Sequence, residues 1–433
     1  MFCGNCFRDN ALVRALRSQG HDVLMVPLYL PLTLDEEDQS RGTPIFFNGI
    51  NVYLEQKSKW FRTAPAWVHR IFGSPRLMKW AAGRTAKTRA ADLGDITLSM
   101  IRGEDGNQAR ELEQFIAFLK TQPRPEVICL SNVLLAGMAR RLKSELGATI
   151  ACVLQGEDAF LDGLPESHRA RTWQTLAERC RDIDLFLPPS DYFGRLMSQR
   201  LDLPAEKVRV VHDGINLDGY ENIEPRPPQN PTLGFFARMC REKGLDTLVE
   251  AFILLKERNR VKNLKLKVGG SCGPADQPLV RALCDRLKAK VFLEDVEFFP
   301  NVDRAGKLEF LRSLSVLSVP ALYGEAFGLY LIEAMASGVP VVQPRHAAFP
   351  EIIAASGGGV ICEPGSPGAL ADALEPLLLD PERARSLGAT GRKSVLEKFN
   401  SNQMARATLR VYEEARTQTP RSVEKPQPVE TLS

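Results

Sequence analysis

The sequence contains no long apolar run, almost no net charge and only one close pair of cysteines. No stretch approaches the roughly 20 apolar residues that a helix needs to cross a bilayer. The first residues lack the charged region and the apolar core of a signal peptide, so the reducing cytoplasm is the expected location. The formal net charge is only +3, and we therefore expect no nucleic-acid partner.

Nine cysteines are scattered along the chain, and only Cys3 and Cys6 lie close together. One CxxC pair cannot supply the four ligands of a zinc site, and no second pair or histidine cluster is present. Metal binding and redox chemistry are therefore minor alternatives. Cys129, Cys152 and Cys362 occur in apolar runs, as small core residues do. We expect no metal and no bound cofactor.

The length of the chain predicts more than one hydrophobic core. It has 433 residues, of which 44% are hydrophobic and 25% charged, so two or three domains are expected. Four prolines between residues 221 and 232 indicate a linker or a long loop. The predicted organisation is an N-terminal domain over 1–213, a linker over 214–232, a C-terminal domain over 233–398, a helix over 399–415 and a disordered tail over 416–433.

The most informative stretch is 324–342. Residues 329–336 are apolar on every side except for Glu333, which predicts a buried helix ended by Gly338. Glu325 lies at the start of this helix, where free N–H groups favour an anion. A carboxylate in a buried helix is costly without a partner, so we interpret the two glutamates as ligands for hydroxyl groups. In the alternative, Glu333 pairs with an internal arginine and Glu325 caps the helix.

Strand and helix alternate after Thr232, which predicts a second parallel sheet. The strand over 233–237 leads into a loop with three cations, Arg238, Arg241 and Lys243. Cations at the carboxyl end of a strand suit a diphosphate, although exposed cations in a solvated loop are also ordinary.

The N-terminal half begins with a predicted helix over 9–20 and a predicted buried strand over 22–30. A doubly wound domain usually starts with an earlier strand and a Gly-rich turn. Residues 1–7, with Gly4 among them, are interpreted as that turn, and we hypothesise that the natural start lies upstream. Residues 44–54 are predicted to form a strand pair or a bent strand.

The predicted strand over 148–154 brings polar side chains to its carboxyl end, where ligands bind in open α/β sheets. Gln155, Glu157 and Asp158 are therefore candidate binding residues. In the alternative, the two acids only cap the next helix.

Residues 56–91 contain nine lysines or arginines, three of the four tryptophans and no acidic residue. Such a stretch suits peripheral contact with an anionic membrane through 57–89, or an acidic or lipid-linked acceptor. Aromatic residues among cations also suit single-stranded nucleic acid. In the alternative, the stretch is a helical insertion whose aromatic side chains pack inward.

Residues 324–342 closely resemble the donor-site signature of the family-4 retaining glycosyltransferases, which have the GT-B fold. In that signature two glutamates are separated by seven residues and followed by Ala-Met-Ala-x-Gly-x-Pro-Val-Val, and this sequence matches nearly throughout. Residues 237–244 resemble the phosphate-binding Gly-Arg-x-x-x-x-Lys-Gly of the family, with Ala237 in place of the first glycine. Residues 208–216 resemble its Val-x-x-Asn-Gly-Ile-Asp turn.

The resemblance implies an α/β protein of GT-B fold, with two Rossmann-like doubly wound domains facing across a cleft. The helix over 399–415 would cross back to the first domain. The implied activity is transfer of a hexosyl-type unit from a nucleotide diphosphate sugar to a glycan, lipid-linked or small-molecule acceptor, with retention and without a metal. A nucleotide-sugar epimerase, a phosphorylase of related fold and a non-catalytic sugar-nucleotide binder are the alternatives.

The resemblance also implies roles for single residues. Arg238, Lys243 and the backbone N–H groups of Phe327, Gly328 and Leu329 would stabilise the leaving diphosphate.

The remaining donor contacts follow from the same resemblance. Glu325 would bind hydroxyls of the donor sugar and complete the catalytic set with the two cations. Glu333 would bind the ribose, Asn301 and Val302 the base, and Gly4 would lie by the donor phosphates. Gln155 stands where the family often has a histidine, and an amide cannot titrate, so a histidine-based acid or base role is in doubt.

Overall fold

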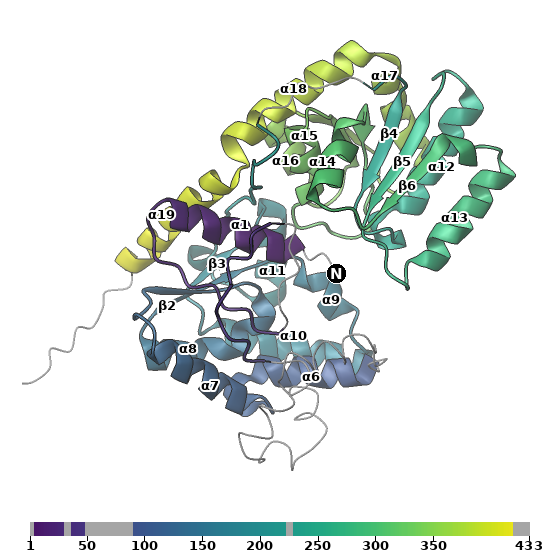
Figure 1. The fold of residues 1–433 in the computed structure, drawn as a ribbon. Helices are drawn as coiled ribbons and strands as arrows, with labels where there is room; N and C mark the ends of the chain where they lie inside the picture. Colours follow the sequence, from purple (N-terminus) through teal and green to yellow (C-terminus); the bar gives the residue numbers. More distant parts are fainter. Residues whose placement is uncertain (1–3, 30–35, 48–89, 222–227, 419–433) are drawn as a thin grey trace, which may run out of the picture.

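The computed structural model describes residues 4–29, 36–47, 90–221 and 228–418, which form two α/β units (Figure 1). The first unit has a three-stranded parallel sheet of order β1-β2-β3. The second has a six-stranded parallel sheet of order β6-β5-β4-β7-β8-β9. Its strand order reverses between β4 and β7, as in a doubly wound sheet. The predicted α/β class with two parallel sheets is confirmed.

The first unit is built around β2, whose alternate side chains face two different cores. Ile150 and Cys152 pack into one cluster, and Ala151 and Val153 into the other, so the strand is buried on both faces. The elements of this unit are α1 (Gly4–Ser18), α6 (Ala90–Arg102), α7 (Ala109–Lys120), β1 (Val127–Leu130), α8 (Ala139–Leu146), β2 (Thr149–Val153), α9 (Glu157–Asp162), α10 (Glu166–Cys180), β3 (Leu185–Leu187) and α11 (Asp191–Leu201).

The second unit has one large core, which includes Leu233 and Phe235 of β4 and Leu266 and Val268 of β5. Both strands are apolar on both faces because helices cover the two sides of the sheet. Its elements are β4 (Thr232–Phe236), α12 (Leu245–Arg258), β5 (Lys265–Gly270), α13 (Gln277–Ala289), β6 (Val296–Pro300), α14 (Arg304–Arg312), β7 (Val316–Leu317), α15 (Leu329–Ala336), β8 (Val341–Pro344), α16 (Phe349–Ser356), β9 (Gly359–Cys362), α17 (Pro367–Leu379) and α18 (Pro381–Lys398). The last described helix of the chain, α19 (Ser401–Gln418), follows α18.

The chain passes between the two units twice, at neighbouring places. The Ile215 N–H donates to the Phe399 carbonyl at 3.1 Å, and the Ser401 N–H donates to the Ile215 carbonyl at 2.8 Å. Figure 1 shows α18 and α19 running along one side of the molecule, with α19 beside α1. Met404 of α19 shares a buried cluster with Leu16 of α1. The last helix is therefore part of the first unit's core.

Two predictions for the N-terminal half are wrong. Helix α1 begins at Gly4 rather than at residue 9, so residues 4–7 belong to the helix and not to a turn. The longer helix holds the buried Arg8 guanidinium 2.9 Å from Asp9 and 3.0 Å from Asp213, which pins α1 to the first unit. Residues 22–29 form no strand. The described residues before them form only a helix, which offers no strand to pair with.

Several predictions fall on residues that the structure does not describe. The basic stretch 56–91 is described only at 90–91, where α6 begins, and the tail only at 416–418, where α19 ends. The predicted strand pair over 44–54 shows no strand over 44–47, and the rest lies outside the described residues. Among the helices that are described, none is long and apolar enough to cross a membrane.

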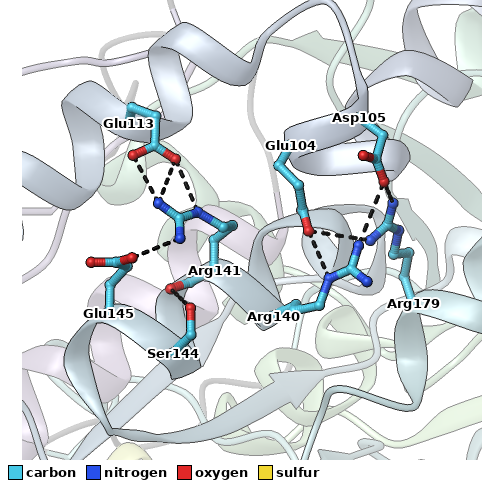
Figure 2. Close-up of polar contacts among 8 residues, drawn as sticks. All are labelled: Glu104, Asp105, Glu113, Arg140, Arg141, Ser144, Glu145 and Arg179. Carbon is cyan, nitrogen blue, oxygen red and sulfur yellow. Dashed lines mark hydrogen bonds and ion pairs between the residues drawn. The ribbon is translucent and has the colours of Figure 1, made fainter.

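Charged side chains join α7, α8 and α10 of the first unit with the short 3₁₀ helix Gly103–Asp105 (Figure 2). Arg141 of α8 binds Glu113 of α7 through two hydrogen bonds of 3.0 Å, and Arg140 binds Glu104 at 2.6 Å. Arg179 of α10 reaches Asp105. Most of these groups are partly exposed, so we assign the network to helix packing and not to a ligand site.

Candidate active site

The candidate site lies where the strand order of the second sheet reverses, at the carboxyl ends of β4 and β7. Open α/β sheets bind ligands at this place because the loops on either side diverge and leave a crevice. Helix α15 begins here, and the structure confirms its predicted range, 329–336. Gly328 precedes it with φ 92° and ψ 68°, a left-handed conformation that glycine adopts without strain. Gly328 has no side chain that could cap α15. The free N–H groups at the start of the helix therefore suit an anion.

Lys243 and Glu325 form the central pair of the site. The loop after β4 carries the lysine and the loop after β7 carries the glutamate, and Nζ lies 2.5 Å from Oε2. The Tyr330 and Tyr323 hydroxyls also donate to Oε2, at 2.9 and 3.3 Å. Lys243 lies over both rings, 4.9 Å from the centre of Tyr323 and 5.3 Å from that of Tyr330. Two loops that are 82 residues apart are therefore joined by one ion pair.

The surroundings of this pair favour the charged form of Lys243. Burial favours the neutral amine, but the Glu325 carboxylate outweighs it and raises the pKa of Lys243 above its ordinary value. Burial, followed by the Glu325 charge, raises the pKa of Tyr323 to about 12, so the phenol stays protonated and donates. Glu325 makes no hydrogen bond to the N–H groups of α15 among the described residues, so the helix-cap alternative is wrong.

Glu333 also has a cationic partner. Lys307 of α14 donates to its Oε1 at 2.9 Å, and both side chains are mostly buried. The partner is a lysine from the neighbouring helix and not the arginine of the alternative. Together with Leu329, the two residues line a small cavity of about 30 Å³ whose opposite wall includes Phe7 and Arg8 of the first unit. Glu333 therefore faces the junction between the units.

Arg238 is held by an acid that the sequence did not single out, Asp276. The Arg238 Nε donates to Oδ1 at 3.0 Å, and Nη2 lies 2.8 Å from the same oxygen. Burial opposes ionisation of Asp276, but the hydrogen bond from Arg238 holds the pKa of this carboxyl below its ordinary value. The guanidinium is the more exposed partner, so it still has N–H groups for another ligand.

The predicted base loop after β6 is shaped by Asn301. This residue has φ 57°, a conformation that asparagine tolerates better than most residues. Its side chain bonds both backbone groups of Cys272, with Oδ1 accepting at 3.0 Å and Nδ2 donating at 3.1 Å. Val302 follows as a half-buried residue that leads into α14. Both polar atoms of the Asn301 amide therefore hydrogen-bond the protein backbone.

Phe327 and Gly4, two of the predicted donor-binding residues, have different surroundings. Phe327 is buried, with its ring 6.1 Å from that of His212 and 6.2 Å from that of Phe399. Its side chain thus packs at the junction, and only its backbone is a candidate for ligand contact. Gly4, the first residue of α1, lies next to Leu329: a Cβ added to the glycine would be 3.9 Å from Leu329 Cδ1. The starts of α1 and α15 are therefore close together.

The three candidates on the first unit lie together after β2 but differ in their contacts. Glu157 is 5% exposed, and its two oxygens accept the N–H groups of Val133 at 3.0 Å and Gln155 at 2.7 Å. Burial raises its pKa to about 7. The Gln155 side chain donates to the Ser131 carbonyl at 2.9 Å. Asp158 Oδ1 is buried and has no hydrogen-bond partner among the described residues.

The second unit also provides contacts across the junction. Glu351 of α16 accepts the N–H of Asp191 at 2.9 Å and that of Tyr192 at 3.2 Å, so it caps α11 of the first unit. Its Oε1 is 3.2 Å from His212 Nε2. The Ser190 hydroxyl, the side-chain cap of α11, donates to the carbonyl of Ala326 in the candidate donor loop at 2.7 Å. The donor loop is therefore fastened to the first unit.

Sequence reasoning missed Asp276, Lys307, Tyr323, Tyr330 and Glu351. Of these, only Tyr323 and Tyr330 could have been suspected from the sequence, since both lie within seven residues of Glu325. The described residues contain no group of three or more His, Cys, Asp or Glu side chains that could hold a metal ion.

Two Rossmann-like units with a site at this switch point define the GT-B class. HepE of Anabaena, solved with UDP, has a TM-score of 0.61 at 14% identity, over 90% of this chain and 100% of that chain. A glycosyltransferase of Rickettsia africae also has a TM-score of 0.61, at 15% identity over 92% and 100% of the two chains. At these identities the likeness shows the fold alone.

Family models identify the chain more closely. The model described as "Glycosyl transferase 4-like domain" matches residues 10–214, and the one described as "Glycosyl transferases group 1" matches residues 219–394. The chain therefore belongs to the group 1 glycosyltransferases, as its motifs predict.

Curated relatives are similar over part of their length. D-inositol 3-phosphate glycosyltransferase of Streptomyces avermitilis is 32% identical over 219 residues, which are 48% of this chain and 46% of that protein. The putative colanic acid biosynthesis glycosyltransferase WcaL of Escherichia coli is 29% identical over 286 residues, 63% of this chain and 66% of that protein. The chain thus spans about half to two thirds of the length of these relatives.

Proposed function

We propose that this protein is a retaining glycosyltransferase that moves a hexosyl-type unit from a nucleotide diphosphate sugar to an acceptor hydroxyl. The observation that carries the proposal is the meeting of Lys243, Glu325 and the start of α15 at the switch point of the second sheet. A cation, a carboxylate and helix N–H groups complement a diphosphate that is joined to a sugar. Because HepE was solved with UDP and glucose, uridine is the first base to test.

The donor would be held mainly by the second unit. Arg238, Lys243 and the N–H groups of 327–329 stabilise the charge that develops on the leaving diphosphate. Glu325 keeps Oε1 for sugar hydroxyls, since its contacts with described residues end on Oε2. Glu333 keeps Oε2 for a ribose hydroxyl while Oε1 accepts from Lys307. Asn301 and Val302 place the base loop, and Gly4 lies beside the phosphates.

The acceptor would lie against the end of β2. Asp158 has an oxygen without a partner among the described residues, so it is the acid that we assign to an acceptor hydroxyl. Gln155 adds an amide but no titratable group. Glu157 is assigned to structure, because backbone N–H groups occupy both of its oxygens.

Donor binding and turnover test the proposal in sequence. UDP, GDP and ADP are first screened by thermal shift, since a nucleotide that binds the folded protein raises its melting temperature. The matching sugar nucleotide is then incubated with candidate acceptors, and the anomer of the product is read by NMR. We expect a product with the donor's anomeric configuration. An inverted product, or no binding of any nucleoside diphosphate, would contradict the proposal.

A matched pair of variants locates the chemistry. Glu325→Ala is expected to abolish transfer while the fold is kept, whereas Glu382→Ala, at an exposed position of α18, should leave it unchanged. Incubation of the sugar nucleotide alone separates the alternatives. A new epimer would indicate an epimerase, and binding without any turnover would indicate a non-catalytic binder.

Location and membrane contact stay predictions. The cytoplasmic location follows from the sequence alone, and the stretch 57–89 lies outside the described residues. A liposome-binding assay with charge reversal at Arg62, Arg70 and Lys79 tests the contact, and unchanged binding would contradict it.

A further inference from the structure

The loops after β4, β5 and β6 are tied to one another by hydrogen bonds. The Met239 N–H donates to the Ser271 carbonyl at 2.9 Å, which joins the first loop to the second. The Asn301 N–H donates to the Gly270 carbonyl at 2.8 Å, and its side chain bonds Cys272, which joins the second loop to the third. These strands are neighbours in the sheet, so their loops form one continuous ridge.

Asp276 holds the loop after β5 in place through hydrogen bonds to Gly273. Its N–H donates to the Gly273 carbonyl at 3.0 Å, and its Oδ2 accepts the Gly273 N–H at 2.9 Å. The side chain is 6% exposed, while that of its partner Arg238 is 56% exposed. Asp276 precedes α13 but makes no side-chain hydrogen bond to that helix, so it is not there to cap it. Its carboxylate is committed to the Gly273 turn and to Arg238.

We propose that Asp276 is a positioning residue that aims the Arg238 guanidinium at the donor diphosphate. The inference rests on the proposed function. A guanidinium has five N–H groups; the Nε of Arg238 donates to both oxygens of Asp276, at 3.0 and 3.2 Å, and Nη2 lies 2.8 Å from Oδ1. One N–H of Nη1 and one N–H of Nη2 form the next edge of the planar group, which faces away from Nε. That edge matches two phosphate oxygens, as in bidentate recognition.

Asp276 would help binding by holding the Arg238 side chain in its binding position in advance. A free arginine side chain loses rotamer entropy when a ligand immobilises it. Asp276 immobilises Arg238 before the donor arrives, so that this cost does not fall on binding. The same ridge carries the Asn301 loop, so the diphosphate and base contacts are set on one rigid element.

The test compares a nucleoside diphosphate with its monophosphate in single and double variants of the full chain. Isothermal titration measures the binding of UDP and UMP to the wild type, Asp276→Asn, Arg238→Lys and the double variant. If the wild type binds guanosine or adenosine nucleotides instead, GDP and GMP or ADP and AMP are used. Asp295→Asn is the matched control, because Asp295 is likewise paired with cations, Lys256 and Lys265 at 2.7 Å, but lies at the amino end of β6.

We expect Asp276→Asn to weaken diphosphate binding about tenfold and monophosphate binding less than about twofold. Arg238→Lys should have a similar effect, and the double variant should bind about as weakly as either single one, since both changes remove the same interaction. Asp295→Asn should bind both nucleotides as the wild type does. A purely structural role of Asp276 would instead weaken both nucleotides alike.

Three results would overturn the inference. Unchanged or tighter diphosphate binding in Asp276→Asn would mean that the acid competes with the ligand. If the double variant weakens diphosphate binding by the product of the two single factors, the two residues act separately. If the wild type binds no nucleoside diphosphate, the proposed function fails together with this inference, whereas binding by the wild type without the expected coupling overturns the inference alone. If Asp276→Asn does not fold, Asp276→Glu replaces it, because the longer side chain keeps the charge but shifts the carboxylate.

Discussion

The pH dependence of the first unit tests the role of one buried carboxyl, Glu157. It is 5% exposed, and burial raises its pKa from an ordinary 4.5 to about 7. The folded state therefore binds this proton more tightly than the unfolded state. The contribution to stability is full below the unfolded pKa and is lost as the pH rises through the folded pKa. At 1.36 kcal/mol for each pH unit between the two values, the loss is about 3 kcal/mol.

Glu157→Gln removes the titration but keeps the size of the side chain. The amide can accept only one of the two backbone N–H groups, from Val133 and Gln155, so the variant should be less stable than wild type by about 1–3 kcal/mol at low pH, where Glu157 of the wild type is protonated. The free energy of unfolding of the variant relative to wild type should then rise by about 3 kcal/mol between about pH 4 and about pH 8.

Urea unfolding followed by tryptophan fluorescence measures this difference. Trp173 of α10 lies in the unit that contains Glu157, so its fluorescence reports on the unfolding of that unit. Glu166→Gln, at an exposed position in the same unit, is the control and should show no pH-dependent difference. A constant difference between Glu157→Gln and wild type across this pH range would refute the reasoning.

Three further predictions concern other parts of the molecule. Lys243→Met leaves the Glu325 carboxylate without its cation in a site where the two side chains are only 19% and 14% exposed, so the second unit should lose about 2–4 kcal/mol and melt lower by calorimetry. An unchanged melting temperature would contradict this. Val291 has φ 62° and is 86% exposed, so Val291→Gly should stabilise by about 1 kcal/mol in urea unfolding, and a loss of stability would argue against strain there. Glu351→Ala removes the acceptor of two N–H groups at the start of α11, so the units should separate more often and the radius of gyration in X-ray scattering should increase. An equal radius would show that the other junction contacts suffice.

The parts of the fold that depend on local pattern could be predicted. Residues 329–336 form a helix with the predicted ends, because an apolar run between Gly328 and Gly338 has only one way to be buried. The segment 22–30 was as apolar as a strand, yet 22–29 is not one. A strand requires a neighbour, and the neighbour is a property of the sheet and not of the segment.

The sequence predicted which residues are candidates for ligand contact, but not the residues that hold them in place. The loop cations and the two glutamates follow from the motif, since each belongs to a short continuous stretch. Their partners do not, because Asp276 lies 38 residues from Arg238 and Lys307 lies 26 residues from Glu333. No local rule links residues at such separations. The same holds for Glu157, whose role depends on the N–H of Val133, 24 residues away.

The sequence by itself determined the class of the protein and the chemical types gathered at its site. Two runs of alternating strands and helices specify two parallel sheets, and the charged loops at strand ends predict an anionic ligand. Only the tertiary structure decided which charges are paired, which oxygens stay available and how the units are fastened together. Pairing depends on distances of a few ångströms between side chains from different elements, and those distances exist only after the sheets have formed and their helices have packed.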